Sequence, residues 1–99
     1  MNTKNISISD AEYSGQDCYA YVITLLKPMT VREFINELVD GLKEESGMIR
    51  IANTDNYYSY AYGKTEEYRI NREYVDTYIN FVRGYGGWSM SNFIIFLKE

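Results

Sequence analysis

The stretch that decides the fold is Pro28-Met-Thr-Val-Arg-Glu-Phe-Ile-Asn-Glu-Leu-Val-Asp-Gly-Leu42. Thr30 and Glu33 have the spacing of a capping box, in which each side chain accepts a hydrogen bond from the backbone N–H of the other residue. Met29 and Phe34 stand at the two positions of a hydrophobic staple. These signals together predict that a helix begins at Thr30.

The apolar residues that follow recur at the period of an α-helix. They form one continuous face made of Val31, Phe34, Ile35, Leu38, Val39 and Leu42. Gly47 is the expected stop, because glycine commonly ends a helix in the left-handed conformation. The sequence therefore predicts one helix over about residues 30–46.

The chain on both sides of this helix is typical of β-strands. Ile6 and Ile8 alternate with serines, and a run rich in Tyr, Val, Ile and Leu follows, so residues 1–27 are expected to form a β-hairpin. Beyond the helix we expect, in order, a strand over 48–52, a turn over 53–56, a strand over 57–62 closed by Gly63, and a last strand over about 88–98. The last strand is apolar at every position of 93–97, which suggests that both of its faces are covered or that it pairs with another chain.

Residues 71–83 fit two structures. A helix would gather Tyr74, Val75, Tyr78, Ile79 and Val82 on one face, whereas a strand would alternate the apolar residues with polar ones. The β-branched and aromatic content favours the strand, with Gly84-Tyr-Gly-Gly87 as the turn to the last strand. The expected fold is a single α+β domain over 1–99, a two-layer sandwich of a mostly antiparallel sheet on one main helix. Its expected order is β-β-α-β-β-(β or α)-β.

The composition excludes several classes of function. The chain of 99 residues has 14 acidic and 10 basic side chains, no histidine, and Cys18 as its single cysteine. A structural zinc site, an internal disulfide and a histidine-activated nucleophile are therefore not expected. The net charge of −4 argues against binding to nucleic acid or to an anionic membrane. With no leader and no apolar run long enough to span a bilayer, we expect a cytoplasmic protein.

No motif satisfies the geometry that its chemistry requires. Tyr60 and Lys64 have a Tyr-x-x-x-Lys spacing, but such a pair meets only on a helix and this segment is expected to be a strand. The adjacent pairs Glu44-Glu45 and Glu66-Glu67 point in different directions and so do not converge on one substrate atom. We therefore predict no catalytic residues, no metal site and no cofactor.

The 11 tyrosines supply the first candidate binding surface. In the strand 57–62, the period of two places Tyr58, Tyr60 and Tyr62 on one face. They form a binding platform if that face is exposed, or part of the core if it packs under the helix. The candidate partner-binding residues are Tyr58, Tyr60, Tyr62, Tyr85 and Trp88.

The second candidate surface is the acidic stripe of the helix. Its members follow one another at helical spacing opposite the apolar face, and they are Glu33, Glu37, Asp40 and Glu44. Such a stripe could steer a basic protein surface into contact, or it could be an ordinary solvated face.

Three short motifs, taken in order, resemble a group of small bacterial proteins. Thr30-Val-Arg-Glu-Phe-Ile35 follows a strand, Tyr62-Gly63 closes another, and Gly86-Gly-Trp-Ser89 enters the aromatic last strand. The resemblance covers about residues 20–98 and supports the strand alternative for 74–83. Asn92-Phe93 stands where that group usually has an acidic residue followed by Tyr. The group has no established activity, so the resemblance implies no functional residues.

The sequence thus predicts a non-catalytic protein-interaction or regulatory module. Its expected partner is another protein or a second copy of itself, and a membrane partner is not expected. The alternative is a small ligand or a single-stranded nucleic acid bound on a tyrosine-rich sheet face, with nucleic acid made less favourable by the acidity of the chain.

Overall fold

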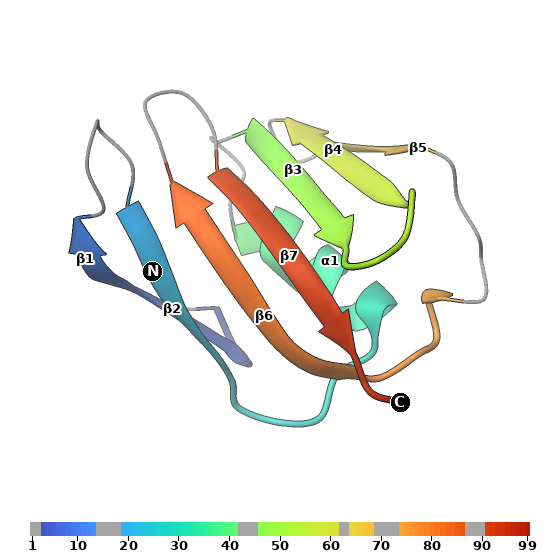
Figure 1. Ribbon diagram of the computed structural model, residues 1–99, viewed down its shortest axis with the longest axis horizontal. Helices are drawn as coiled ribbons and strands as arrows, with labels where there is room; N and C mark the ends of the chain where they lie inside the picture. Colours follow the sequence, from blue (N-terminus) through green and yellow to red (C-terminus); the bar gives the residue numbers. More distant parts are fainter. Residues whose placement is uncertain (1–2, 14–18, 42–45, 62–63, 69–73, 87–90) are drawn as a thin grey trace.

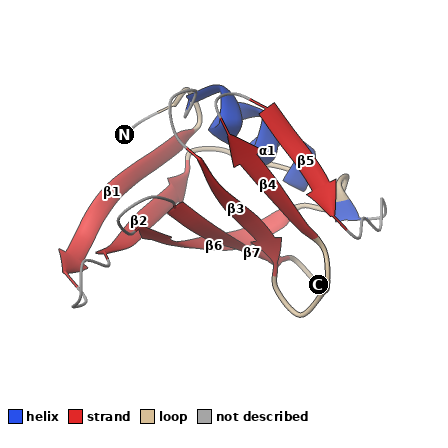
Figure 2. Cartoon of the chain, turned by 90° about the horizontal axis from the view of Figure 1, so that it is seen from above, coloured by secondary structure: helices blue, strands red, loops and turns tan. Residues whose placement is uncertain are grey.

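The computed structural model describes residues 3–13, 19–41, 46–61, 64–68, 74–86 and 91–99. Its elements are β1 (Ile6–Tyr13), β2 (Tyr19–Leu25), α1 (Val31–Gly41), β3 (Ser46–Ile51), β4 (Tyr57–Ala61), β5 (Lys64–Tyr68), β6 (Ile79–Gly86) and β7 (Ser91–Leu97). All seven strands belong to one sheet, and α1 lies against one side of it (Figure 1, Figure 2). The expected α+β arrangement of a mostly antiparallel sheet on one helix is confirmed.

The strand order of the sheet is β1-β2-β6-β7-β3-β4-β5. β1 and β2 form the expected antiparallel hairpin, and every other neighbouring pair is antiparallel except β3 with β7. The parallel β3–β7 pair lies inside the sheet. As a result β7, the last strand in the chain, joins a half made of β1, β2 and β6 to a half made of β3, β4 and β5.

The start of α1 has the capping box that the sequence predicts. The backbone N–H of Thr30 donates to Oε1 of Glu33 over 3.1 Å, and the backbone N–H of Glu33 donates to the hydroxyl oxygen of Thr30 over 3.3 Å. Met29 and Phe34, the expected staple, are both buried in the core. Local capping and core packing therefore fix the same helix start.

The turn before β6 completes this helix start. The carbonyl oxygen of Thr77 accepts from the N–H of Val31 over 3.1 Å, and that of Val75 accepts from the N–H of Arg32 over 2.9 Å. The guanidinium of Arg32 also pairs with Asp76 over 3.4 Å. The backbone donors that a helix leaves open at its beginning are thus taken up by a segment more than 40 residues later in the chain.

The predicted helix end is wrong. The described helix ends at Gly41, Ser46 already belongs to β3, and residues 42–45 lie outside the described part of the chain. Gly47 is a strand residue and does not stop the helix. A Cβ atom there would collide with the backbone oxygen of Ser91 and lie 2.5 Å from the hydroxyl oxygen of Tyr60, so this glycine permits close packing.

The strand alternative for the ambiguous segment is correct over its second half. Residues 79–86 form β6, residues 74–77 form a turn, and 71–73 are among the undescribed residues. The expected glycine turn is wrong for Gly84 and Gly86, which are strand residues of β6. Side chains of β2 fill the space above them: a Cβ on Gly84 would lie 2.6 Å from Ile23, and one on Gly86 would collide with the ring of Tyr21.

β5 is a strand that the sequence reading missed. The strand expected over 57–62 ends at Ala61 in the structure, and Lys64–Tyr68 returns beside it in antiparallel register. The segment Lys-Thr-Glu-Glu-Tyr has little of the apolar alternation that marks a strand. Charged residues are common on strands at a sheet edge, where they discourage pairing with other chains.

The core lies between α1 and the sheet. All five buried side chains of the helix contribute to it, and they come from the face that the sequence predicts. The buried hydrophobic residues are Ile6, Ile8, Met29, Val31, Phe34, Ile35, Leu38, Val39, Ile49, Ile51, Tyr58, Tyr60, Ile79, Val82, Phe93 and Ile95. The single described helix covers one side of the sheet only. The side chains on the opposite side of the sheet are not part of this core.

Candidate functional site

The predicted tyrosine platform is not on the surface. Tyr58 and Tyr60 are 3% and 1% exposed, and both belong to the core beneath α1. This corrects their assignment as exposed partner-binding residues, and of the two alternatives the packed one is right. Tyr62 and Trp88 lie outside the described residues. Tyr85 alone of the five candidates is found exposed, at 42%.

The acidic stripe is only partly a free surface. Glu33 is exposed, but it is engaged by Thr30 and by Lys27, whose ammonium lies 3.5 Å from its carboxylate. Hydrogen bonds from the backbone N–H and then the hydroxyl of Thr30 lower the pKa of Glu33, and Lys27 adds to the shift. Asp40 is exposed, and Glu44 falls in an undescribed segment.

Glu37 ties the first described residues of the chain to α1. Its carboxylate accepts hydrogen bonds from the hydroxyl of Thr3, from the backbone N–H of Asn5 over 2.8 Å and from the Asn5 side-chain amide over 2.8 Å. Burial would raise the pKa of Glu37, but these hydrogen bonds outweigh it and the pKa is lowered. Glu37 therefore stabilises the fold, and its carboxylate is not free to bind a partner as a member of the acidic stripe.

The side of the sheet opposite α1 is the most distinctive surface of the molecule. Figure 1 looks onto this side, with the helix behind the strands. We call it the open face, since no described element covers it (Figure 2). The alternation of buried and exposed residues along the strands places on it the apolar, aromatic and basic residues Val22, Met48, Arg50, Tyr57, Phe81, Arg83, Tyr85, Ile94 and Phe96. It also places there the polar residues Ser7, Ser9, Thr24, Ser59 and Asn92.

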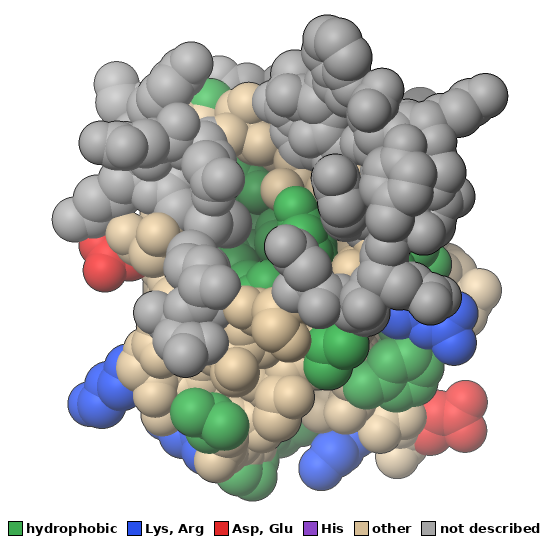
Figure 3. Space-filling view, turned by 90° about the vertical axis from the view of Figure 1, so that its left-hand side faces the viewer, with side chains coloured by type: hydrophobic (Ala, Val, Ile, Leu, Met, Phe, Trp, Pro, Cys, Tyr) green, Lys and Arg blue, Asp and Glu red, His purple; other side chains and the backbone are tan. Residues whose placement is uncertain are grey.

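The open face carries exposed apolar and aromatic side chains. Val22, Phe81 and Tyr85 are 50%, 41% and 42% exposed. The rings of Phe81 and Phe96 stack on each other, with centroids 4.4 Å apart and planes 11° apart. The side of the molecule that carries β1 also shows hydrophobic side chains reaching the surface next to basic ones (Figure 3). An antiparallel sheet with one solvated face normally has polar residues there, so the part of this face around Phe81, Tyr85 and Phe96 departs from the usual pattern.

Two arginines stand in one row across the open face. In the β6–β7 register Arg83 is opposite Ile94, and in the β3–β7 register Ile94 is opposite Arg50. Arg50 in turn lies opposite Tyr57 of β4. The guanidinium carbon of Arg83 is 5.7 Å and 5.5 Å from the ring centroids of the stacked pair, Phe81 and Phe96.

No acidic side chain that the structure describes lies on the strands of the open face. Two described acidic residues stand at its border, Asp55 in the turn between β3 and β4 and Glu99 after β7. Among the described residues, the guanidinium groups of Arg50 and Arg83 have no ion-pair or hydrogen-bond partner. Among the side chains that the structure describes, the strands of the open face thus carry two arginines and no acid, in a chain of net charge −4.

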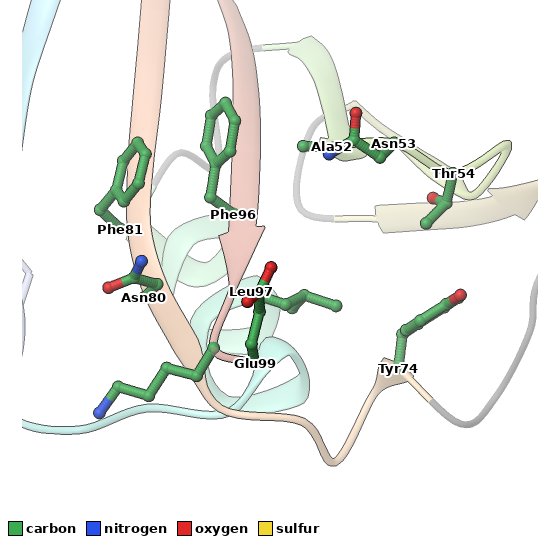
Figure 4. Close-up of a pocket in the computed structure, with 10 residues that line it drawn as sticks. Ala52, Asn53, Thr54, Tyr74, Asn80, Phe81, Phe96, Leu97 and Glu99 are labelled. Carbon is green, nitrogen blue, oxygen red and sulfur yellow. The ribbon is translucent and has the colours of Figure 1, made fainter.

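A pocket of about 690 Å³ opens at one end of this face, where β6, β7 and the turn after β3 meet. In Figure 4 the rings of Phe81 and Phe96 stand side by side from neighbouring strands, with Ala52, Asn53 and Thr54 across from them. Its other lining residues are Tyr74, Asn80, Leu97, Lys98 and Glu99. The lining combines aromatic rings, which could cover an apolar part of a ligand, with amide, hydroxyl and charged groups, which could orient it.

Neither a metal-binding cluster nor a membrane-spanning helix is found in the part of the chain that the structure describes. No cluster of three or more His, Cys, Asp or Glu residues in that part could hold a metal ion. The described helix is too short and too polar to cross a membrane. Cys18 is among the undescribed residues.

Comparison with protein-family models, with curated proteins and with solved structures found no match for this chain. The resemblance to a group of small bacterial proteins therefore stays a prediction.

Sequence reasoning missed most of the open face. One signal pointed to it, because residues 93–97 are apolar at every position, and this places Ile94 and Phe96 on the side opposite the core. Phe81 and Arg83 carried no comparable signal, since the helix alternative left open which side of the segment would face the core.

Proposed function

We propose that this protein is a non-catalytic binding module that docks a partner protein on its open face. The observation that carries the proposal is the exposure of Val22, Phe81 and Tyr85 beside Arg83 on a sheet face that no described element covers. Surface patches of this kind mark interaction sites more often than singly scattered apolar residues do.

The chemistry of the face favours a protein partner. Aromatic residues, methionine and arginine are enriched at protein interfaces, and they supply most of the residues whose truncation weakens binding strongly. Fully burying a side chain such as Val or Phe contributes roughly 1.5–3 kcal/mol. Since Val22 and Phe81 keep about half of their surface in the free protein, each can contribute part of that on docking.

Photo-crosslinking in cells tests this proposal. A benzophenone amino acid placed at Tyr85 is expected to give discrete adducts of higher mass, because Tyr85 is exposed on the open face. The matched control places the same probe at Asn36, which is exposed on α1, on the other side of the molecule. The adducts should disappear when Phe81→Ser is added. Adducts that form equally from both positions, or from neither, contradict the proposal.

A second candidate function is the binding of a small ligand in the pocket beside Phe81 and Phe96. The pocket volume of about 690 Å³ and its mixed lining support it. A panel of nucleotides and glycans is expected to include a ligand that raises the melting temperature of the wild type and leaves Asn80→Leu unaffected. If no member of the panel changes the melting temperature or the tyrosine fluorescence, this candidate is discarded.

A further inference from the structure

The arginines of the open face decide what kind of partner it can accept. Arg83 and Arg50 lie on strands that flank β7, with Ile94 between them. Neighbouring strands are about 4.8 Å apart, so the two backbones are roughly 10 Å apart. A partner that covers Ile94 must therefore come close to both guanidinium groups.

Docking a purely apolar surface here would be unfavourable. Arg83 lies beside the stacked rings of Phe81 and Phe96, so a partner that buries the rings also removes water from the guanidinium. Burying a charge without a counter-charge costs several kcal/mol, and this exceeds the free energy gained when one aromatic ring is buried. The partner must bring its own carboxylates to this row.

A second copy of the chain does not meet these requirements through its open face or through α1. Two open faces in contact would bring arginines against arginines. The α1 surface of another copy is acidic, but its exposed described residues are all polar apart from Gly41, and they are Arg32, Glu33, Asn36 and Asp40. Such a surface could pair with arginine, yet it would leave Phe81 and Val22 without an apolar contact.

A single-stranded nucleic acid is anionic but fits the aromatic groups less well. Base stacking needs ring faces that are free, whereas Phe81 and Phe96 each cover one face of the other. The net charge of −4 also opposes the approach of a polyanion from a distance.

We infer that the open face binds a protein segment that is both apolar and acidic, whose Asp or Glu side chains pair with Arg83 and Arg50 while its apolar side chains cover Phe81 and Ile94. This inference rests on the proposed function and adds the chemistry of the partner. Arginine suits the role because its planar guanidinium binds carboxylates through two parallel hydrogen bonds.

Selection from a library of random 16-residue peptides displayed on phage, with the full chain immobilised, tests the inference. The enriched peptides are expected to combine Asp or Glu with Leu, Phe or Trp. Their affinity should fall about 30-fold or more in Arg83→Glu and in Arg50→Glu, as for the loss of a desolvated charge pair. Lys4→Glu is the matched control, because it makes the same charge change at an exposed position outside the strands. It should leave the affinity nearly unchanged.

The remaining outcomes separate the inference from the proposed function. Peptides that lose binding in Phe81→Ser but contain no acidic residues overturn the inference and leave the open face as a binding surface. Peptides that bind regardless of Phe81→Ser, or no enrichment at all, count against both. Tighter binding of a random single-stranded DNA pool than of any enriched peptide, lost in Arg83→Glu, would reassign the face to nucleic acid.

Discussion

Gly47 and Gly86 make room for aromatic rings on the core side of the sheet. The ring of Tyr60 stands where a side chain at position 47 would be, and the ring of Tyr21 stands over Gly86. Tyr21 also stacks on Phe93, with centroids 6.3 Å apart. Glycine in a strand is unfavourable by itself. At these positions the burial of a large aromatic side chain offsets that cost.

Gly47→Ala is expected to destabilise the protein by about 1–3 kcal/mol, because the new methyl group would collide with the backbone of Ser91 and with Tyr60. Urea unfolding followed by circular dichroism measures the loss. Gly41→Ala is the control, since Gly41 is exposed at the end of the described helix and alanine favours a helix by up to about 1 kcal/mol. Equal effects of the two substitutions would show that close packing at Gly47 is unimportant.

Glu37→Gln is expected to reduce the free energy of unfolding at pH 7 by about 1 kcal/mol, because neutral amide oxygens are weaker acceptors for Thr3 and Asn5. The lowered pKa of Glu37 means that its contribution to the free energy of unfolding decreases as the pH falls. Its contribution is complete above the ordinary glutamate pKa of about 4.3 and is lost as the pH falls through the lower pKa of the folded state.

Unfolding curves at pH 7 and pH 3 check this prediction. The variant should lose less stability than the wild type on acidification, since it no longer has this carboxylate to protonate. Glu99→Gln removes a carboxylate from an exposed position after β7 and should follow the wild type. Parallel curves for Glu37→Gln and the wild type would contradict the assigned role.

At the scale of elements, the predictable features were those with a local cause. Thr30 and Glu33 define the helix start through contacts within four residues, and the structure has those contacts. Gly47 was misread as a helix stop because its role depends on Ser91 and Tyr60, which no local pattern connects to it. β5 was missed because its strand structure comes from pairing with β4 and its own sequence is polar.

The candidate site was less predictable than the fold for a related reason. Alternation in β4 correctly placed Tyr58 and Tyr60 on one side, but it could not say which side α1 would cover. Phe81 and Phe96 form a pair only through the β6–β7 register, and that register is set by tertiary structure. The period of two in the sequence thus separates the side chains of a strand into two faces. Which of these faces is buried depends on where the helix packs in the tertiary structure.

The two faces of β7 are expected to respond differently to the same substitution. Ile95 is fully buried against the core, whereas Ile94 lies on the open face and is partly exposed. Ile95→Ala should reduce the free energy of unfolding by about 2–5 kcal/mol, and Ile94→Ala by less than about 1 kcal/mol. Denaturant unfolding measures both. A large loss for Ile94→Ala would mean that the open face is covered in the free protein.

For the whole molecule, the order of the strands implies an uneven distribution of stability. Five strands have hydrogen-bonded neighbours on both sides, and β6, β7 and β3 are the central three of them, whereas β1 and β5 are the edges of the sheet. Native-state hydrogen exchange should therefore be slowest in the three central strands, with opening free energies close to that of global unfolding, and fastest at the edges. Equal protection of β5 and β7 would contradict this.

The position of β7 also has a consequence for biosynthesis. A nascent polypeptide leaves the ribosome in chain order, so β1 to β6 emerge before the strand that connects their two halves. The parallel partner of β7 is β3, more than 40 residues earlier, and this pairing closes a long loop late in the process. Until residues 91–97 are available, the exposed edges of β3 and β6 are vulnerable to mispairing, and a chaperone that shields them would raise the yield of folded protein.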